Sequence, residues 1–240
     1  MNNDIVSRRY TEGDYAEQNP EWDSDDSSWK AQHVVSMMKA LNIEANSIVE
    51  IGCGAGGVLA CVRSAYPCAK LVGFDIAPCL PKYWERYAGS EITFVLGDFL
   101  ALNEEVVDVL LVLDVLEHLA DPISFLDRLR CHGKIVVFHI PLDLSAVSVI
   151  RETPLLHVRH KVGHIHYFTR GLVRAMVEEC GYEVLQERYT GAYLSAPGRS
   201  IFTKSFGLLR RIINGFNHDV GARLLGGETL MIVARPRRNV

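Results

Sequence analysis

A glycine-rich turn is the clearest chemical signal in the sequence. Residues 50–57 read EIGCGAGG, directly after an apolar run and before a segment of helical spacing that begins near Val58. Glycines let the backbone approach a ligand where a Cβ would collide, and a helix N-terminus offers unpaired N–H groups. The turn predicts a cofactor site. Because Gly52, Gly54 and Gly57 also satisfy G-x-G-x-x-G, the turn alone does not separate one nucleotide cofactor from another.

Acidic residues follow the next two apolar runs. Asp75 ends the second run, and Asp98 and Phe99 come just after the third. A carboxylate after the second strand of a nucleotide-binding fold suits a ribose, because it accepts hydrogen bonds from both hydroxyls. Asp98 is placed to hold an exocyclic amine and Phe99 to stack on a purine, with a core position as the equal alternative for Phe99. A nucleoside-containing cofactor is favoured.

Histidines supply candidate bases. His157, His160, His164 and His166 fall within ten residues, but without the paired Cys/His spacing of a structural zinc site, so we assign no metal to them. His164 and His166 are candidates to accept a proton from a hydroxyl or amine, and the alternative is that they fix the start of the next helix. His139, at the end of the fifth run, is the third candidate, with a buried structural histidine as its alternative.

Two kinds of segment alternate along the chain and must position these residues. Apolar runs rich in β-branched residues occupy 47–51, 70–74, 92–95, 106–113 and 134–140, with segments of helical spacing between them. Runs that are apolar throughout are typical of parallel strands covered on both faces, which indicates an α/β fold. Two late runs, 182–194 and 228–236, predict an antiparallel pair at the sheet edge.

Helix boundaries can be predicted from their caps. Asp121 precedes a proline, and Thr169 precedes a segment that stops at Gly181, so both are predicted N-caps. We treat residues 1–240 as one domain with a flexible arm or lid at 1–27, a capping helix at 28–41 and an insertion at 195–227 between the last two strands.

Taken in order, these motifs resemble the class I S-adenosylmethionine-dependent methyltransferases. The resemblance rests on EIGCGAG (50–56), GFDIA (73–77), LGDF (96–99) and LDVLEHLADP (113–122), and covers about residues 30–240. It implies a Rossmann-like, doubly wound sheet of seven strands, mostly parallel with an antiparallel last strand. It also implies S-adenosyl-L-methionine as cofactor and S-adenosyl-L-homocysteine as product.

The resemblance implies a set of cofactor contacts. Glu50, Gly52, Cys53, Gly54 and Gly56 would contact the methionine part, and Lys30 would pair with its carboxylate. Asp75, beside Ile76, would contact the ribose, and Asp98 and Phe99 would contact the adenine. Leu113, Asp114 and Val115 would contact the cofactor from its opposite side. Cys53 is expected there as a small side chain rather than a nucleophile.

Asp114, Glu117 and His118 form D-x-x-E-H, which is similar to the E-x-x-E-H metal site of some ubiquinone-type and RNA-end methyltransferases. The first acid here is one methylene shorter, and the L-E-H-L pattern also occurs in relatives without metal. We therefore expect no metal, and a divalent cation on these three residues is the alternative.

The segments LDVLEHLADP, HIPLD and GHIHYFT are similar to ubiquinone-type O-methyltransferases and to methyltransferases that accompany bacterial sugar and surface-polysaccharide enzymes. We expect methyl transfer to a small-molecule or sugar-containing acceptor, at oxygen. One alternative is an NAD(P)-dependent oxidoreductase using the same glycine loop, and Asp98, Phe99 and the LEHL segment argue against it. The other is a non-catalytic cofactor-binding homologue, which the intact glycine and acidic set disfavours.

Composition and charge limit the kinds of partner and the compartment that we expect for the protein. The chain has 240 residues, 48% of them hydrophobic, and its net charge is −4, which favours a substantial core and disfavours nucleic acid as a partner. Six cysteines without a CxxC pair and an N-terminus without an apolar export signal predict a reduced, cytoplasmic protein. The longest apolar run is too short to span a membrane. The basic amphipathic segment 202–216 is expected to cap the core, and weak contact with a membrane surface or a lipid-linked sugar is its alternative. Oligomeric state is left open.

Overall fold

The computed structural model describes residues 5–237 except 20–21, 23, 192–214 and 216. The strands are β1 (Ser47–Ile51), β2 (Lys70–Asp75), β3 (Ile92–Leu96), β4 (Val107–Leu113), β5 (Gly133–Leu142), β6 (Tyr182–Tyr189) and β7 (Glu228–Pro236). The described α-helices are α1 (Ile5–Thr11), α2 (Asp14–Gln18), α3 (Ser27–Ala40), α4 (Gly57–Arg63), α5 (Pro81–Trp84), α6 (Phe99–Leu102), α7 (Pro122–Leu129), α8 (Ala146–Arg151), α9 (Thr153–Lys161), α10 (Arg170–Glu179) and α14 (His218–Leu225), and the 3-10 turns are η1 (Ser24–Asp26), η2 (Glu85–Tyr87) and η3 (Leu116–His118).

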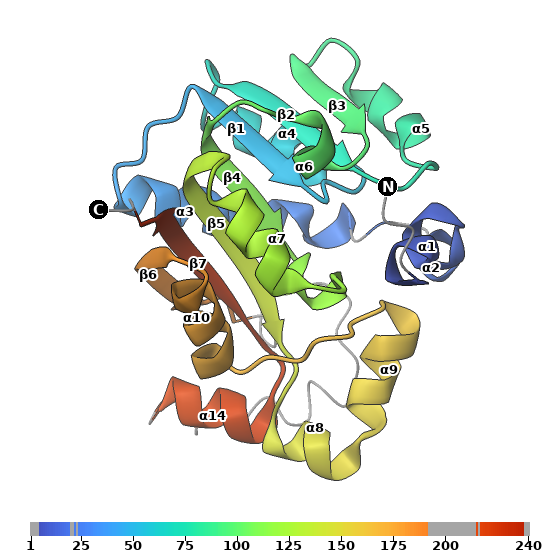
Figure 1. The fold of residues 1–240 in the computed structure, drawn as a ribbon, viewed down its shortest axis with the longest axis vertical. Helices are drawn as coiled ribbons and strands as arrows, with labels where there is room; N and C mark the ends of the chain where they lie inside the picture. Colours follow the sequence, from blue (N-terminus) through green and yellow to red (C-terminus); the bar gives the residue numbers. More distant parts are fainter. Residues whose placement is uncertain (1–4, 20–21, 23, 192–214, 216, 238–240) are drawn as a thin grey trace.

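The strands form one sheet of order β3-β2-β1-β4-β5-β7-β6 (Figure 1). Strands β1 to β5 pair in parallel, whereas β7 runs antiparallel to both β5 and β6. The predicted seven-stranded, doubly wound sheet with an antiparallel last strand is therefore confirmed. The strand order reverses between β1 and β4, which is where ligands bind in open sheets of this kind.

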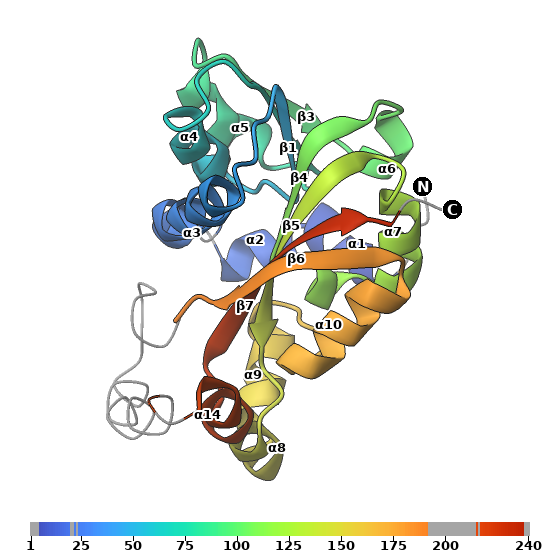
Figure 2. The same cartoon turned by 90° about the vertical axis from the view of Figure 1, so that its left-hand side faces the viewer.

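Helices cover both faces of the sheet, as the continuous apolar runs predict. Figure 2 shows α3, α4 and α5 on one side of the sheet and α6, α7 and α10 on the other. Neighbours on β4 point to opposite faces: Leu110 packs into the core beside α7 and α10, and Leu111 into the core beside α3 and α4. Both are fully buried. The strand interiors are apolar because both faces are covered.

Local capping signals fix several helix ends. The Asp121 side chain accepts a hydrogen bond from the Ser124 N–H at 2.9 Å, and Thr169 accepts one from the Leu172 N–H at 3.3 Å. Gly181 has a φ of +84°, the left-handed conformation that favours glycine after a helix. Both predicted N-caps are present, and the predicted helix at 28–41 is α3.

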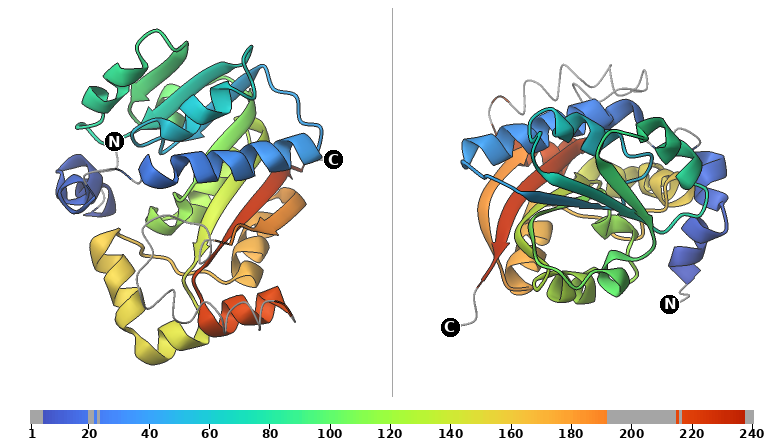
Figure 3. Two further views of the ribbon diagram at one scale, coloured as in Figure 1. Left: turned by 180° about the vertical axis from the view of Figure 1, so that it is seen from behind. Right: turned by 90° about the horizontal axis from the view of Figure 1, so that it is seen from above.

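The expected arm at 1–27 contains α1, α2 and η1 in its described part. Figure 1 and the rear view in Figure 3 show α1 and α2 beside the end of α9, which lies more than 130 residues away in the sequence. The Arg9 guanidinium donates to the carbonyl of Arg159 at 2.9 Å, and the Asn19 amide donates to the carbonyl of Lys161 at 3.2 Å. Two side chains of the arm thus cap the C-terminal carbonyls of α9.

Most of the expected insertion at 195–227, and most of the basic segment 202–216, lies outside the described residues; α14 is the described helix of that region. Among the helices that the structure describes, none is long and apolar enough to cross a membrane.

Candidate active site

The glycine loop between β1 and α4 is held against the end of β4. Gly52, Gly54 and Gly56 have φ values of +72°, +50° and +85°. A Cβ on Gly52 would lie 2.8 Å from Cγ2 of Val115, closer than real Cβ contacts. The two strand ends at the reversal point therefore touch through a position that only glycine can occupy.

Asp75 connects the end of β2 to this loop. Its Oδ2 accepts the Gly54 N–H at 2.9 Å, and its Oδ1 accepts the Ala77 N–H at 3.0 Å. Burial raises the pKa of Asp75, and these backbone hydrogen bonds act against that rise. Ile76, 37% exposed, stands beside it as an apolar side chain at the edge of the loop. Asp75 is thus held in the expected place, and its ribose contact stays a prediction.

Glu50 lies inside the sheet, 3% exposed, near the end of β1. Its Oε2 has no hydrogen-bond partner in the part of the chain that the structure describes. Burial raises the pKa of Glu50 to about 8, while the positive charge of Lys30 acts in the opposite direction. A buried carboxylate with a free oxygen is suited to a cationic ligand group.

Asp114 stands at the end of β4 with a φ of +54° and binds two partners. Its Oδ1 lies 2.7 Å from Nδ1 of His139, and its Oδ2 lies 2.7 Å from the ammonium of Lys30. Lys30 also pairs with Asp26 at 2.9 Å. Burial alone would raise the pKa of Asp114, but His139 and Lys30 outweigh it and hold the pKa well below its usual range. Asp114 is therefore ionised.

His139 is 1% exposed, and both of its ring nitrogens have partners. Nδ1 faces Asp114, and Nε2 lies 3.1 Å from the hydroxyl of Thr229 and 3.4 Å from that of Thr190. Asp114 accepts from Nδ1, and the hydroxyls of Thr190 and Thr229 lie within hydrogen-bonding distance of Nε2. These contacts are those of a buried structural histidine, and the role of His139 as a base stays a prediction.

Asp98 and Phe99 follow β3 as expected but face different surroundings. Asp98 is exposed and accepts a backbone N–H of α6 at 2.9 Å as its N-cap. Phe99 is 1% exposed and packs edge-on against Phe74, with ring centroids 5.2 Å apart. The Phe99 ring is therefore a core side chain in this structure, the alternative that the sequence left open. Leu113 is likewise buried, and Cys53 is a buried thiol whose pKa is raised by burial.

A second group of polar side chains gathers around Glu117, which follows Asp114 by three residues. Glu117 on η3 is fully buried, and neither of its carboxylate oxygens has a hydrogen-bond partner among the described residues. Nε2 of His118 lies 3.9 Å and Nε2 of His164 lies 4.0 Å from Oε1 of Glu117. We call Glu117, His118 and His164 the Glu117 cluster. Burial, with the nearby charge of Asp114, raises the pKa of Glu117 well above its usual range.

Backbone hydrogen bonds bring His164 to this cluster. The N–H groups of Ile165 and His166 both donate to the carbonyl of Glu117, at 2.8 and 3.1 Å. Nδ1 of His164 lies 2.6 Å from Oδ2 of Asp143. The loop before α10 is thus fastened to η3, and Asp143 orients the imidazole of His164.

Tyr10 brings the N-terminal arm to the same cluster. Its hydroxyl lies 2.8 Å from Nδ1 of His118. Burial lowers the pKa of His118 to about 4, so the ring is neutral near pH 7. Gly163 permits this approach: its φ is +88°, and a Cβ there would lie 2.8 Å from the guanidinium of Arg9 and 3.1 Å from the hydroxyl of Tyr10.

The remaining candidate histidines have other places. Nε2 of His166 donates to the carbonyl of Leu119 at 2.9 Å, which matches the alternative in which this residue fixes the loop. His157 and His160 are exposed on α9. The three possible metal ligands of the D-x-x-E-H pattern do not stay together either. Asp114 is bound by Lys30 and His139, and His164 lies beside Glu117 and His118 instead.

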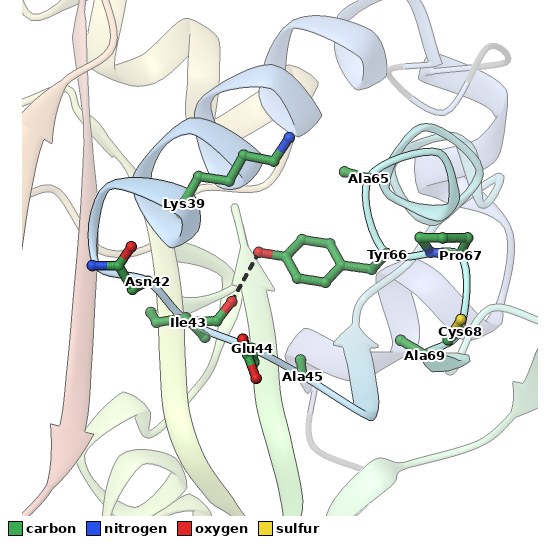
Figure 4. A pocket seen from close by; sticks show the side chains of 10 residues that line it. All are labelled: Lys39, Asn42, Ile43, Glu44, Ala45, Ala65, Tyr66, Pro67, Cys68 and Ala69. Carbon is green, nitrogen blue, oxygen red and sulfur yellow. Dashed lines mark hydrogen bonds between the residues drawn. The ribbon is translucent and has the colours of Figure 1, made fainter.

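A cavity of about 370 Å³ lies at the opposite end of the sheet and does not coincide with either group (Figure 4). Tyr66 projects into it, and its hydroxyl donates to the carbonyl of Ile43. The lining residues are Lys39, Asn42, Ile43, Glu44, Ala45, Ala65, Tyr66, Pro67, Cys68 and Ala69. Because these residues precede β1 and β2, the cavity is remote from the strand ends that carry the glycine loop.

The comparison with protein families matches the methyltransferase domain over residues 28–187, more than half of the chain. The chain belongs to the methyltransferase domain family. The predicted membership of the class I S-adenosylmethionine-dependent methyltransferases is thereby confirmed, and the cofactor of that family is S-adenosylmethionine. No curated relative matches the sequence.

Solved structures share the methyltransferase fold at low sequence identity. The plantazolicin methyltransferase BpumL, in complex with a desmethyl plantazolicin analogue and S-adenosylhomocysteine, has a TM-score of 0.64 at 13% identity, covering 98% of this chain and 94% of its own. A protein from Galdieria sulphuraria described as a sarcosine dimethylglycine methyltransferase has a TM-score of 0.62 at 15% identity. The match covers 88% of this chain and 86% of that protein. Magnesium protoporphyrin IX methyltransferase from Synechocystis, with bound S-adenosylhomocysteine, has a TM-score of 0.56 at 15% identity, covering 88% and 83%.

Proposed function

We propose that this methyltransferase moves the methyl group of S-adenosylmethionine to a hydroxyl oxygen of a small-molecule or sugar-containing acceptor. One observation carries the proposal: in a member of the methyltransferase family, the glycine loop, Asp75 and Asp114 converge where the strand order reverses. The structural relatives described above that act on small molecules support the acceptor class by analogy.

The cofactor cradle, by which we mean Glu50, the loop 52–56, Asp75 and the Lys30–Asp114 pair, offers a group for each part of the cofactor. The free, buried oxygen of Glu50 suits the ammonium of the methionine part. Lys30 has three N–H donors, two of which serve Asp26 and Asp114, so the third suits the methionine carboxylate. Asp75 would accept from the ribose hydroxyls, and Asp98 and Ile76 would border the adenine.

We place the acceptor at the Glu117 cluster. Its turn, η3, follows Asp114 by three residues, and the charge of Asp114 raises the pKa of Glu117. In the transfer, an oxygen lone pair forms a bond to the methyl carbon while the carbon–sulfur bond breaks toward sulfur. The sulfonium supplies the activated methyl group, and the protein aligns the acceptor oxygen with it.

His164 is the histidine best placed to take the hydroxyl proton. Asp143 accepts from its Nδ1 at 2.6 Å, and this contact turns Nε2 toward Glu117, where it would receive the proton. His139 differs, because Thr190 and Thr229 occupy its Nε2. We therefore assign His139 and His166 to positioning, His139 for Asp114 and His166 for the loop.

The alternatives make different predictions for ligand binding. Family membership removes the support for an NAD(P)-dependent oxidoreductase, although the glycine spacing alone allows it. A cofactor-binding homologue without turnover would bind S-adenosylmethionine and transfer nothing. We propose oxygen rather than nitrogen because a neutral hydroxyl is a weak nucleophile and gains most from a base such as His164, although a base could also deprotonate an ammonium acceptor.

The first experiment is titration calorimetry of the full chain with S-adenosylmethionine, S-adenosylhomocysteine and NADH in parallel. We expect micromolar binding of the first two and none of NADH, and NADH binding alone would contradict the proposal. Transfer of a radiolabelled methyl group is then measured with acceptor pairs that differ only in a hydroxyl or an amine at the same carbon. Labelling confined to the amines would overturn the assignment to oxygen.

A further inference from the structure

The Glu117 cluster contains a carboxylate that the described part of the chain leaves without a counterpart. Glu117 is fully buried, and neither Oε1 nor Oε2 receives a hydrogen bond from any described residue. Burying a carboxylate in this way costs free energy unless a proton or another cation binds it. The methyl transfer proposed above gives Glu117 no task, so its position calls for a separate explanation.

Two imidazoles aim at the same carboxylate oxygen. Nε2 of His118 and Nε2 of His164 lie 3.9 and 4.0 Å from Oε1 of Glu117, and all three atoms lie within 4.8 Å of one another. The far nitrogen of each ring is held in turn, by the Tyr10 hydroxyl at 2.8 Å and by Asp143 at 2.6 Å. Rings whose far nitrogens are fixed while the near nitrogens converge are typical of metal ligands.

We propose that Glu117, His118 and His164 bind a divalent transition-metal ion beside the cofactor cradle. Tyr10 and Asp143 are the residues that orient the two imidazole ligands. Two imidazoles with one carboxylate suit Zn²⁺, Mn²⁺, Fe²⁺ or Co²⁺, whereas Mg²⁺ and Ca²⁺ prefer oxygen ligands alone. This site replaces our expectation, from the sequence, that no metal is bound.

The three atoms lie somewhat further apart than they would around a bound ion. Ligand atoms about 2.1 Å from a tetrahedral metal are about 3.4 Å from one another. The two distances to Oε1 of Glu117, 3.9 and 4.0 Å, would shorten by about half an ångström on binding. The two imidazole nitrogens, within 4.8 Å of each other, need at most a small rotation of the rings.

The ligand set differs from the one that the D-x-x-E-H pattern implies. Both oxygens of Asp114 are occupied, Oδ1 by His139 and Oδ2 by Lys30, each at 2.7 Å. Taking up a metal would require Asp114 to release two charged or hydrogen-bonded partners. His164, 50 residues further along the chain, fills the third position instead.

The ion would change the task of His164. A bound divalent ion lowers the pKa of a hydroxyl that approaches it, so that the hydroxyl can lose its proton to solvent. His164 then serves as a ligand and no longer as the base proposed above. This catalytic consequence rests on the proposed function, whereas the binding of the ion does not.

The test is calorimetry of the full chain, stripped with a chelator and dialysed, with Zn²⁺ and Mn²⁺ and without S-adenosylmethionine. We expect one equivalent of at least one of the two ions, checked by elemental mass spectrometry. Glu117→Gln and His164→Ala should each weaken binding by about a hundredfold or more. Tyr10→Phe should weaken it by about tenfold, the effect of losing a group that orients a ligand.

Two substitutions are matched controls for the ligand assignment. Asp114→Asn removes the acid of the D-x-x-E-H pattern, and His157→Ala removes an exposed histidine of the neighbouring helix α9. His157→Ala should leave the metal affinity within about threefold, because it is exposed and is not a ligand. Asp114→Asn removes a nearby negative charge but no ligand, so it should weaken binding by no more than about tenfold. The visible absorption of bound Co²⁺, recorded for each variant with its circular dichroism, separates a lost ligand from a lost fold.

Three outcomes would overturn the inference. These are no binding of either ion, equal binding by the wild type and Glu117→Gln, and loss of binding in Asp114→Asn with retention in His164→Ala. Each is independent of the cofactor titration. A chain that binds S-adenosylmethionine and no metal keeps the proposed function and loses only this site.

Discussion

Asp114 and Glu117 are acidic residues three positions apart whose pKa values are shifted in opposite directions. Asp114, in the cofactor cradle, lies between Lys30 and His139, and its pKa is held far below the usual range. Glu117, on the acceptor side, is more deeply buried and faces the imidazoles of His118 and His164, and its pKa is raised. The comparison shows that partners, and not burial alone, decide the charge of a buried carboxylate.

The same two regions differ in how they are built. The acids of the cradle lie at the ends of β1, β2 and β4: Glu50 and Asp75 are among the last two residues of their strands, and Asp114 comes directly after its strand. The acceptor side joins η3, the loop before α10 and the arm, through contacts such as that of Tyr10 with His118, 108 positions apart. Substitutions that affect only one region test this division.

The largest effect is expected from Gly52→Val in the cradle. The new side chain would collide with Val115 and would have to adopt a φ of +72°, so the loop would move away from β4. We expect S-adenosylmethionine binding to weaken by about a hundredfold or more, a free-energy loss of about 2.8 kcal/mol, measured by calorimetry.

The control is Gly89→Ala, which has a similar φ of +83° but open space around its Cβ. It should retain the cofactor affinity of the wild type. If both variants bound alike, close approach at Gly52 would not be what shapes the cradle.

His164→Ala tests the acceptor side. We expect methyl transfer to fall by about a hundredfold, because either a base or a metal ligand is lost, while the affinity for S-adenosylmethionine stays within about twofold. Transfer of a labelled methyl group and calorimetry give the two values. Parallel losses of both would instead show that His164 holds the structure of the whole site.

Asp75→Ala should weaken cofactor binding by at least about tenfold, a loss of about 1.4 kcal/mol. The substitution removes the acceptor for the ribose diol and also the support that Oδ2 gives to the Gly54 N–H. Calorimetry with S-adenosylhomocysteine measures it. An unchanged affinity would contradict the ribose assignment.

The smallest effect is expected on stability, from Glu50→Gln. The pKa of Glu50 is about 8 in the folded protein, above its value in the unfolded chain, so the wild type loses stability as the pH rises from about 4.5 to 8. The glutamine variant avoids that loss. It should melt several degrees above the wild type at pH 8, and the difference should shrink toward pH 5.

Thermal unfolding followed by circular dichroism at the two pH values measures this difference. The same variant should bind S-adenosylmethionine more weakly, because the carboxylate proposed for the ammonium is gone. A melting difference that is the same at both pH values would show that Glu50 does not titrate in this range.

The sequence by itself determined the layers, the strands and the cradle. Apolar strands that alternate with turns and helices along the chain have one favourable arrangement, a parallel sheet with right-handed connections. N-caps such as Asp121 can be predicted because they act within one turn of helix. Family resemblance then supplied roles for Glu50, Asp75 and Asp114, and the structure places all three at the expected strand ends.

Only the tertiary structure decided which of the histidines and acids meet. The spacing of His164 and His166 gives no reason for their rings to differ. The N–H groups of Ile165 and His166 donate to the carbonyl of Glu117, and this fastening directs the ring of His164 to the cluster and that of His166 to Leu119. Tyr10 and Asp143 each contact a histidine, and no local motif predicted either contact. Their partners lie in other segments, and contacts between distant segments form only when the whole chain packs.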